Sequence, residues 1–198
     1  MRKSAISGVS LVVLMCWLNT VIASPMVYTD KTLWENALGG QFQTEDFSDL
    51  VLNDGINYDS SESGHISPGE ENYQDVLASF SNNEPTTIWL FDSGTFGSGI
   101  YAYGGTWTLG GPGGTGNSLL VSIGDPSEYV GYISNSYDGE FWGFISNTPF
   151  ASVKLIGGSG TTQQNFKLDN MVYSQVPEPA TISLMTLSAI AMIRRRRL

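Results

Sequence analysis

The sequence has few of the residues that most often carry chemistry or crosslinks. It contains one cysteine, Cys16, and one histidine, His65, among 198 residues. A single cysteine excludes a disulfide within the chain and a cysteine-based zinc site. A single histidine excludes the paired histidines of a zinc protease, and no G-x-S-x-G motif supplies a hydrolase nucleophile. We therefore expect that the protein is not an enzyme.

Basic residues are also scarce, and most of them lie in the two terminal segments. Between residues 24 and 176 there are three lysines, no arginine and eighteen acids, which gives a net charge of −15. A surface this acidic repels a phosphate backbone, so nucleic acid is excluded as a partner.

Long apolar runs are missing as well, and the first short one has the order of a signal peptide. Arg2 and Lys3 precede an apolar stretch at residues 9–18, and small residues follow up to Ala23. This order predicts secretion with cleavage between Ala23 and Ser24. The alternative is a membrane anchor, although the stretch is shorter than the ~20 residues of a spanning helix. We expect a signal peptide at residues 1–23 and a single domain at 24–176.

A second short apolar run lies near the C-terminus, between a proline-rich tripeptide and a basic cluster. The fourteen residues 180–193 carry no charge, and Arg194, Arg195, Arg196 and Arg197 follow them. A helix of this length spans ~21 Å, which is less than the ~30 Å of a bilayer core. Guanidinium groups stay on the cytoplasmic side, so the preceding domain would lie outside. We expect a short transmembrane helix at 180–193 that holds only temporarily; a permanent tail anchor is the alternative.

The order of these segments resembles a known sorting signal. Pro177, Glu178 and Pro179, followed by the apolar segment and the arginine cluster 194–197, resemble the PEP-CTERM signal at residues 177–198. The resemblance implies that a membrane transpeptidase of the exosortase class recognises the tripeptide and processes the tail. It also implies transient anchoring in the inner membrane. The protein would then be placed at the cell surface or in an extracellular matrix that contains polysaccharide.

The domain at 24–176 has the pattern of an all-β protein. Short aromatic and β-branched runs alternate with turn residues, which predicts a jelly-roll-like β-sandwich with one short N-terminal helix, besides the C-terminal sorting helix. The expected strands are Met26–Thr29, Val76–Phe80, Thr87–Phe91, Gly99–Tyr103, Thr106–Leu109, Leu119–Ile123, Tyr129–Ser134, Glu140–Ile145, Ser152–Ile156 and Phe166–Ser174.

Turn and cap residues refine this prediction. Thr32 and Glu35 have the spacing of a capping box, and Gly39-Gly40 would end the helix that they begin. Asp138-Gly139 lies between two aromatic runs and predicts a hairpin turn. Residues 53–75 are polar and acidic, so we expect a long loop there. Residues 111–116 formally match G-x-G-x-x-G but precede a strand pattern, which favours turns over a dinucleotide site.

Parts of the domain resemble passenger domains that precede PEP-CTERM tails. Glu45-Asp46-Phe47 and the last strand, Phe166–Tyr173, carry this similarity. Such passengers resemble carbohydrate-binding sandwiches, which implies a structural or carbohydrate-binding module and polysaccharide as a partner. An envelope glycan hydrolase is the alternative, because a glycosidase needs only two carboxylates.

Two candidate ligand sites follow from residue types. Oxygen-rich side chains gather at Asp46, Asp49, Asp54, Asn57, Asp59 and Glu62. Because calcium prefers oxygen ligands and terminal strands often lie close together, we expect that Asp169 on the last strand and the early acid Asp46 could close a calcium site; solvated loop charge is the alternative. Sugar rings stack on exposed aromatic side chains, and Trp107 and Trp142 are our candidates for an exposed platform, with burial in the core as the alternative.

Overall fold

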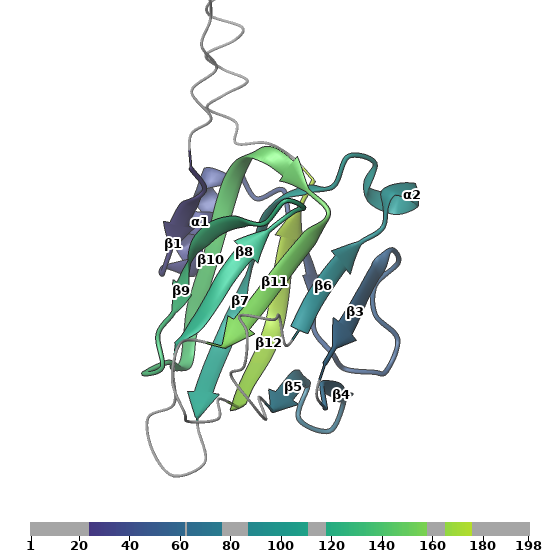
Figure 1. The fold of residues 1–198 in the computed structure, drawn as a ribbon, viewed down its shortest axis with the longest axis vertical. Helices are drawn as coiled ribbons and strands as arrows, with labels where there is room; N and C mark the ends of the chain where they lie inside the picture. The colour runs from purple at the N-terminus through teal and green to yellow at the C-terminus, as the bar shows by residue number, and fades with distance from the viewer. Residues whose placement is uncertain (1–23, 62, 77–86, 111–117, 158–164, 176–198) are drawn as a thin grey trace, which may run out of the picture.

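Two antiparallel β-sheets packed face to face form the folded body of the protein (Figure 1). The computed structural model describes residues 24–61, 63–76, 87–110, 118–157 and 165–175. The predicted signal peptide, the G-x-G-x-x-G segment and the residues from 176 onward lie outside these ranges. Within the described ranges, no helix has the length and apolar character needed to cross a bilayer.

The larger sheet has seven strands among the described residues, and the smaller has five. The larger sheet follows the order β1 (Met26–Tyr28), β10 (Asp138–Phe150), β7 (Ile100–Gly110), β12 (Asn165–Ser174), β5 (Asn72–Val76) and β4 (His65–Ser67), with β2 (Gln43–Glu45) also paired to β12. The smaller sheet follows the order β3 (Ile56–Ser60), β6 (Thr87–Phe91), β11 (Ser152–Gly157), β8 (Leu119–Ile123) and β9 (Glu128–Ile133). The all-β prediction is confirmed, and the jelly-roll connectivity stays a prediction.

The core lies between the inner faces of the two sheets and is rich in aromatic rings. On β11, Val153 and Leu155 are buried while Ser152 and Lys154 are half-buried, which is the expected alternation of a strand with one face on the core. The larger sheet contributes Tyr103 and Trp107, which pack with their ring centroids 6.5 Å apart. Tight aromatic packing of this kind stabilises a domain that has no disulfide.

Helix α1 (Lys31–Ala37) covers the outer face of the larger sheet at β10. Trp34 is fully buried there, and its indole Nε1 donates a hydrogen bond to the Phe144 carbonyl at 3.2 Å. The N-cap of the helix is Asp30, whose carboxylate accepts the Leu33 amide at 3.1 Å. The predicted capping box at Thr32 is therefore wrong, because a carboxylate two residues earlier is the stronger acceptor for the first turn. A second helix, α2 (Ser93–Phe96), follows β6.

Strand β7 joins two predicted strands, Gly99–Tyr103 and Thr106–Leu109, into one. Gly104 and Gly105 suggest a turn in the sequence, but both continue the ladder with β10. A Cβ atom added at Gly104 would lie 2.8 Å from the Gly143 Cα, so the two backbones approach more closely than a side chain allows. The close packing of the two strands requires glycine here, and it explains why one continuous strand was predicted as two.

Asp138-Gly139 is not a hairpin turn. β9 pairs with β8 and β10 pairs with β7, so the strands on either side of Asp138 belong to different sheets. Asp138 pairs with Thr108 and Glu140 with Trp107, which leaves Gly139 as an extra residue with a φ of 97°. This is a β-bulge at the start of β10, and glycine is favoured because of the positive φ.

The predicted loop at residues 53–75 is also wrong, because this segment holds β3, β4 and β5. β3 and β4 lie at the edges of their sheets, where one side of the strand faces solvent and polar residues are tolerated. β5 contributes the buried Tyr73 and Asp75 to the interior. Because of its polar composition, this segment was predicted as a loop although it contains the edge strands β3 and β4 and the inner strand β5. Most of the predicted strand Val76–Phe80 lies outside the described residues.

Candidate functional site

A groove of about 400 Å³ runs along the side of the sandwich where β9 lies beside β1. Two tyrosines of β9 border it, and both are exposed: Tyr129 by 60% and Tyr132 by 58%. The remaining lining residues are apolar or carry hydroxyls: Val27, Thr29, Val130, Gly131, Ser134, Tyr137 and Trp142. None of these described residues carries a formal charge at neutral pH.

A β-bulge gives the two tyrosines the same orientation. Residues three apart in a regular strand point to opposite faces. In β9, however, Tyr129 pairs with Ser122 and Gly131 pairs with Val121, so Val130 is an extra residue. Tyr132 then pairs with Leu120, and both tyrosines lie on the outer face of the smaller sheet. Sequence reasoning missed this pair, because regular alternation would have separated the two rings.

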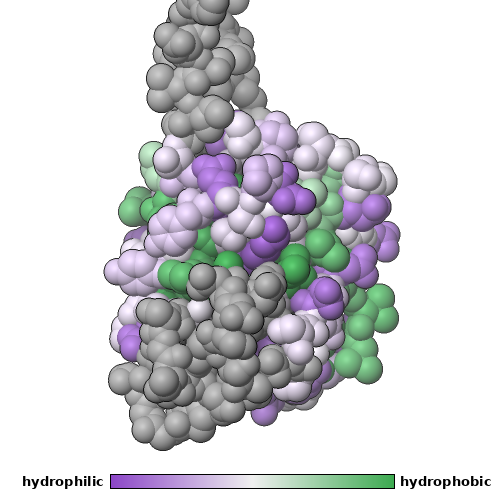
Figure 2. Space-filling view, in the orientation of Figure 1, coloured by the Kyte–Doolittle hydropathy of each residue, from purple (hydrophilic) through white to green (hydrophobic). Residues whose placement is uncertain are grey.

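The outer face next to these tyrosines is partly apolar. Figure 2 shows hydrophobic side chains exposed on this face between polar ones. Leu90 on β6 is 41% exposed, and Leu120 and Ile156, which pair with each other on β8 and β11, are half-buried. Lys154 pairs with Ser122 across this face and donates a hydrogen bond to Ser127 at 2.8 Å. The tyrosines therefore border a surface with aromatic, aliphatic and amine groups.

Trp107 and Trp142 are not an exposed platform, which corrects that prediction. Trp107 is 0% exposed, and its Nε1 donates to the Trp142 carbonyl at 3.1 Å. Trp142 is 2% exposed, although one part of it reaches the wall of the tyrosine groove. Both rings point between the sheets because their strands bury that face. A run of aromatic residues does not reveal which of them face the core.

One predicted calcium residue, Asp46, directly follows β2, and the other, Asp169, lies on the neighbouring strand β12. Glu45 at the end of β2 pairs with Met171, so Asp46 and Asp169 lie at the same part of the sheet. Asp46 accepts the Ser48 amide at 3.0 Å, and this hydrogen bond lowers its pKa. Asp169 accepts the Asn170 side-chain amide at 2.7 Å. In the part of the chain that the structure describes, no three acidic, histidine or cysteine side chains gather as metal ligands. Calcium binding stays a prediction.

Two buried carboxylates serve the fold. Asp75 is 1% exposed, and its Oδ2 accepts hydrogen bonds from the hydroxyls of Ser60, Tyr73 and Thr87, which come from both sheets. Burial raises the pKa of Tyr73 well above its usual value, so its hydroxyl stays protonated and can donate. Glu45 accepts the Phe47 amide at 2.9 Å and the Asn53 amide at 2.7 Å, closing the loop between them.

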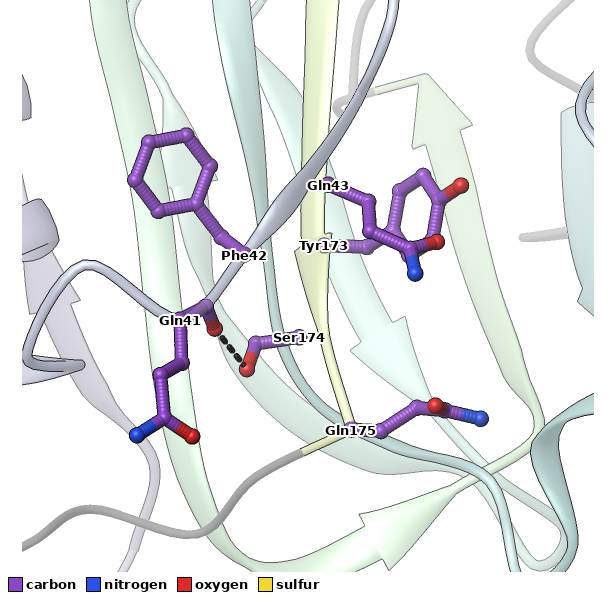
Figure 3. Close-up of a pocket in the computed structure, with 6 residues that line it drawn as sticks. All are labelled: Gln41, Phe42, Gln43, Tyr173, Ser174 and Gln175. Carbon is purple, nitrogen blue, oxygen red and sulfur yellow. Dashed lines mark hydrogen bonds between the residues drawn. The ribbon is translucent and has the colours of Figure 1, made fainter.

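A second pocket, of about 240 Å³, lies where β12 ends (Figure 3). The Ser174 hydroxyl donates to the Gln41 carbonyl at 2.5 Å, and the Gln175 amide donates to the Thr95 carbonyl at 3.1 Å. These contacts attach the end of the last strand to the body. The predicted sorting residues, Pro177 to Pro179 and Arg194 to Arg197, follow in sequence and lie outside the described residues, as does the predicted cleavage residue Ala23. Its neighbour Ser24 is the first described residue and is exposed.

Comparison with known proteins identifies the tail. No curated protein and no solved structure matches the chain. Residues 175–197 match the family model of the PEP-CTERM protein-sorting motif, so the resemblance inferred from the tripeptide, apolar segment and arginine cluster is confirmed. This motif implies export, processing at the membrane and, in general, an exosortase as the processing enzyme. The chain is thus an exported protein that carries a PEP-CTERM sorting motif at residues 175–197.

Proposed function

We propose that the body is a jelly-roll-like passenger that binds polysaccharide and is placed at the cell surface or in the extracellular matrix after exosortase processing. The observation that carries this proposal is the pair of exposed rings, Tyr129 and Tyr132, at one groove. Exposed aromatic side chains bury a large area at low entropic cost, and their faces match the C–H face of a sugar ring.

The charge of the body narrows the ligand class. A body with three lysines and eighteen acids repels polyanions, so a neutral or amine-bearing polysaccharide fits better than an acidic one. Thr29 and Ser134 supply hydroxyls at the groove that can pair with sugar hydroxyls. Stacking then supplies affinity, and these hydroxyls supply orientation.

The composition of the groove supports binding without catalysis. A glycosidase needs two carboxylates about 5–10 Å apart, one on each side of the scissile bond. The described residues that line the tyrosine groove include no acid. The buried carboxylates of Glu45 and Asp75 are committed to backbone amides and hydroxyls inside the body. These arrangements favour a structural or binding module over the alternative of a glycan hydrolase.

Binding of the exported, processed protein to a panel of neutral, amine-bearing and acidic polysaccharides tests this proposal. We expect Tyr129→Ala and Tyr132→Ala each to weaken binding about tenfold, because a stacked ring contributes about 1–2 kcal/mol. Val51→Ala is the control, since Val51 is 78% exposed beside β3, which is the edge of the smaller sheet opposite β9. Wild-type affinity in the double tyrosine variant, or a preference for acidic polysaccharides, would contradict the proposal.

A further inference from the structure

The pocket at the end of β12 adjoins the sorting motif directly. The motif match begins at Gln175, and Gln175 is itself one of the lining residues of this pocket. Ser174 is only 2% exposed and hydrogen-bonded to Gln41, so β12 remains part of the folded body up to the motif's first residue. The motif therefore leaves the body from a fixed point on its surface, with no spacer between them.

The length of chain between this point and the apolar segment limits the distance of the body from the membrane. Five residues, 175–179, separate Ser174 from the apolar segment that starts at Ala180. An extended chain of five residues spans about 17 Å at most. An enzyme that binds Pro177–Pro179 must therefore work within this distance of the folded body. The surface around the exit point is therefore within reach of that enzyme.

This surface is uncharged, in contrast to the acidic body. Its lining residues are Gln41, Phe42, Gln43, Tyr173, Ser174 and Gln175. Figure 3 shows the amides of three glutamines around the pocket, with the Phe42 and Tyr173 rings beside them. Amide groups donate and accept hydrogen bonds without the desolvation cost of a charge. The exposed Gln41 and Gln43 thus offer hydrogen bonds to a protein partner, and the half-buried Phe42 offers apolar contact, whereas the Tyr173 ring is buried.

We propose that this exit pocket, formed by Gln41–Gln43 and Tyr173–Gln175, is a docking surface for the membrane transpeptidase that processes the sorting motif. The enzyme contacts the body at the pocket while its active site holds the tripeptide. Gln175 and Ser174 act as positioning residues, since their bonds to Thr95 and Gln41 fix where the motif leaves the body. The inference does not depend on what the tyrosine groove binds.

Processing of the full-length precursor by membranes that contain the exosortase tests the proposal. The first variant is Gln41→Glu/Gln43→Glu, which places two charges at the pocket. Its matched control, Asn135→Asp/Ser136→Glu, places two charges at the far end of the sandwich. Asn135 and Ser136 precede Tyr137, whose carbonyl accepts the Leu109 amide. Leu109 pairs with Phe166 near the start of β12, whereas the exit pocket lies at the end of β12.

A second variant leaves every side chain of the body unchanged. Six residues, Gly-Ser repeated three times, are inserted between Gln175 and Val176, which separates the motif from the pocket. If the pocket contributes binding that is equal in the ground and transition states, the apparent KM rises and kcat stays constant. We expect the KM to rise about threefold to tenfold in the glutamate and the spacer variants, which is the effect of one or two lost hydrogen bonds. The control variant keeps the wild-type KM.

Three results would overturn the proposal. A spacer precursor processed with the wild-type KM, or faster, would show that the body takes no part in recognition. An equal rise of KM in the far-end control would indicate a general charge effect. A rise of KM in membranes that disappears with the detergent-solubilised enzyme would show repulsion by the lipid surface instead. The melting temperature of each variant reports on folding. Where the glutamate variant is found to be unstable, the KM of the spacer variant alone tests the proposal.

Discussion

The hydroxyl of Tyr103 costs the protein stability, and its removal is expected to stabilise the fold. Tyr103 is 0% exposed, and its hydroxyl has no hydrogen-bond partner among the described residues. Burying an unpaired hydroxyl costs about 1–3 kcal/mol relative to leaving it in water. Tyr103→Phe removes that cost and leaves a void the size of one oxygen atom, which costs about 0.3 kcal/mol. We therefore expect the free energy of unfolding to rise by about 1–2 kcal/mol.

Tyr73→Phe is the matched control for this prediction. Tyr73 is also 0% exposed, but its hydroxyl donates to the Asp75 carboxylate at 3.2 Å and lies 3.2 Å from the Thr87 hydroxyl. A hydrogen bond to a charged group contributes about 1.5–3 kcal/mol, and its loss leaves a buried carboxylate with fewer donors. The same chemical change is therefore expected to destabilise the protein at this position by a similar amount to that gained at Tyr103.

Urea unfolding and thermal unfolding of the processed protein, both followed by tryptophan fluorescence, measure the change in stability of each variant. Trp89 and Trp107 are fully buried, so their emission reports on loss of the core. At about 2–4 °C per kcal/mol for a domain of this size, the two variants differ by about 5–15 °C in melting temperature. A destabilised Tyr103→Phe variant, or two variants of equal stability, would refute the assignment of an unpaired hydroxyl to Tyr103.

Three further predictions concern pH, a helix cap and the groove. Burial raises the pKa of Tyr103 and of Tyr73 above the value of about 10 that tyrosine has in the unfolded chain. The free energy of unfolding is therefore unaffected by these two groups below pH 10 and falls above it. Burial also raises the pKa of Tyr137 and Tyr173. Each such tyrosine contributes a slope of at most about 1.4 kcal/mol per pH unit, and an alkaline denaturation series of Tyr103→Phe should lose the contribution of Tyr103. Asp30→Ala removes the cap of α1 and should cost about 1 kcal/mol in urea unfolding, whereas Asp30→Asn should cost less. Deletion of Val130 removes the bulge of β9 but leaves the two tyrosines two positions apart, which keeps both on the outer face of a regular strand, so polysaccharide binding should be retained; loss of binding with an unchanged melting temperature would show that the common face of the tyrosines is not sufficient.

The parts of the protein that could be predicted from sequence are those for which neighbouring residues decide the outcome. The alternation in Ser152–Leu155 predicted a half-buried strand correctly because each side chain responds to its own face of the sheet. The sorting motif was recognised because the bilayer and the processing enzyme read a linear order of tripeptide, apolar segment and arginines. Glycines 39 and 40 were correctly placed after the first helix, where both have positive φ.

The remaining features depend on residues far apart in the sequence. The bulges at Gly139 and Val130 follow from the pairing of each strand with its neighbour. The polar sequence of the edge strand β3 resembles that of a loop, and its place in a sheet follows only from its pairing with β6. The burial of Trp107 depends on the opposite sheet that covers it. A local pattern contains none of this information.

The proposed docking surface and the proposed polysaccharide groove lie on different strands, so the two proposed interactions would not compete. The exit pocket lies at the C-terminal end of β12 on the larger sheet, beside β2 and α2. The tyrosine groove lies along β9, an edge strand of the smaller sheet that is not paired with β12. Because the short connection holds the exit pocket close to the membrane, a ligand that required the same surface could bind only after processing. A groove on a different edge remains accessible to a polymer both before and after processing, so the polysaccharide affinity of the full-length precursor should equal that of the processed protein.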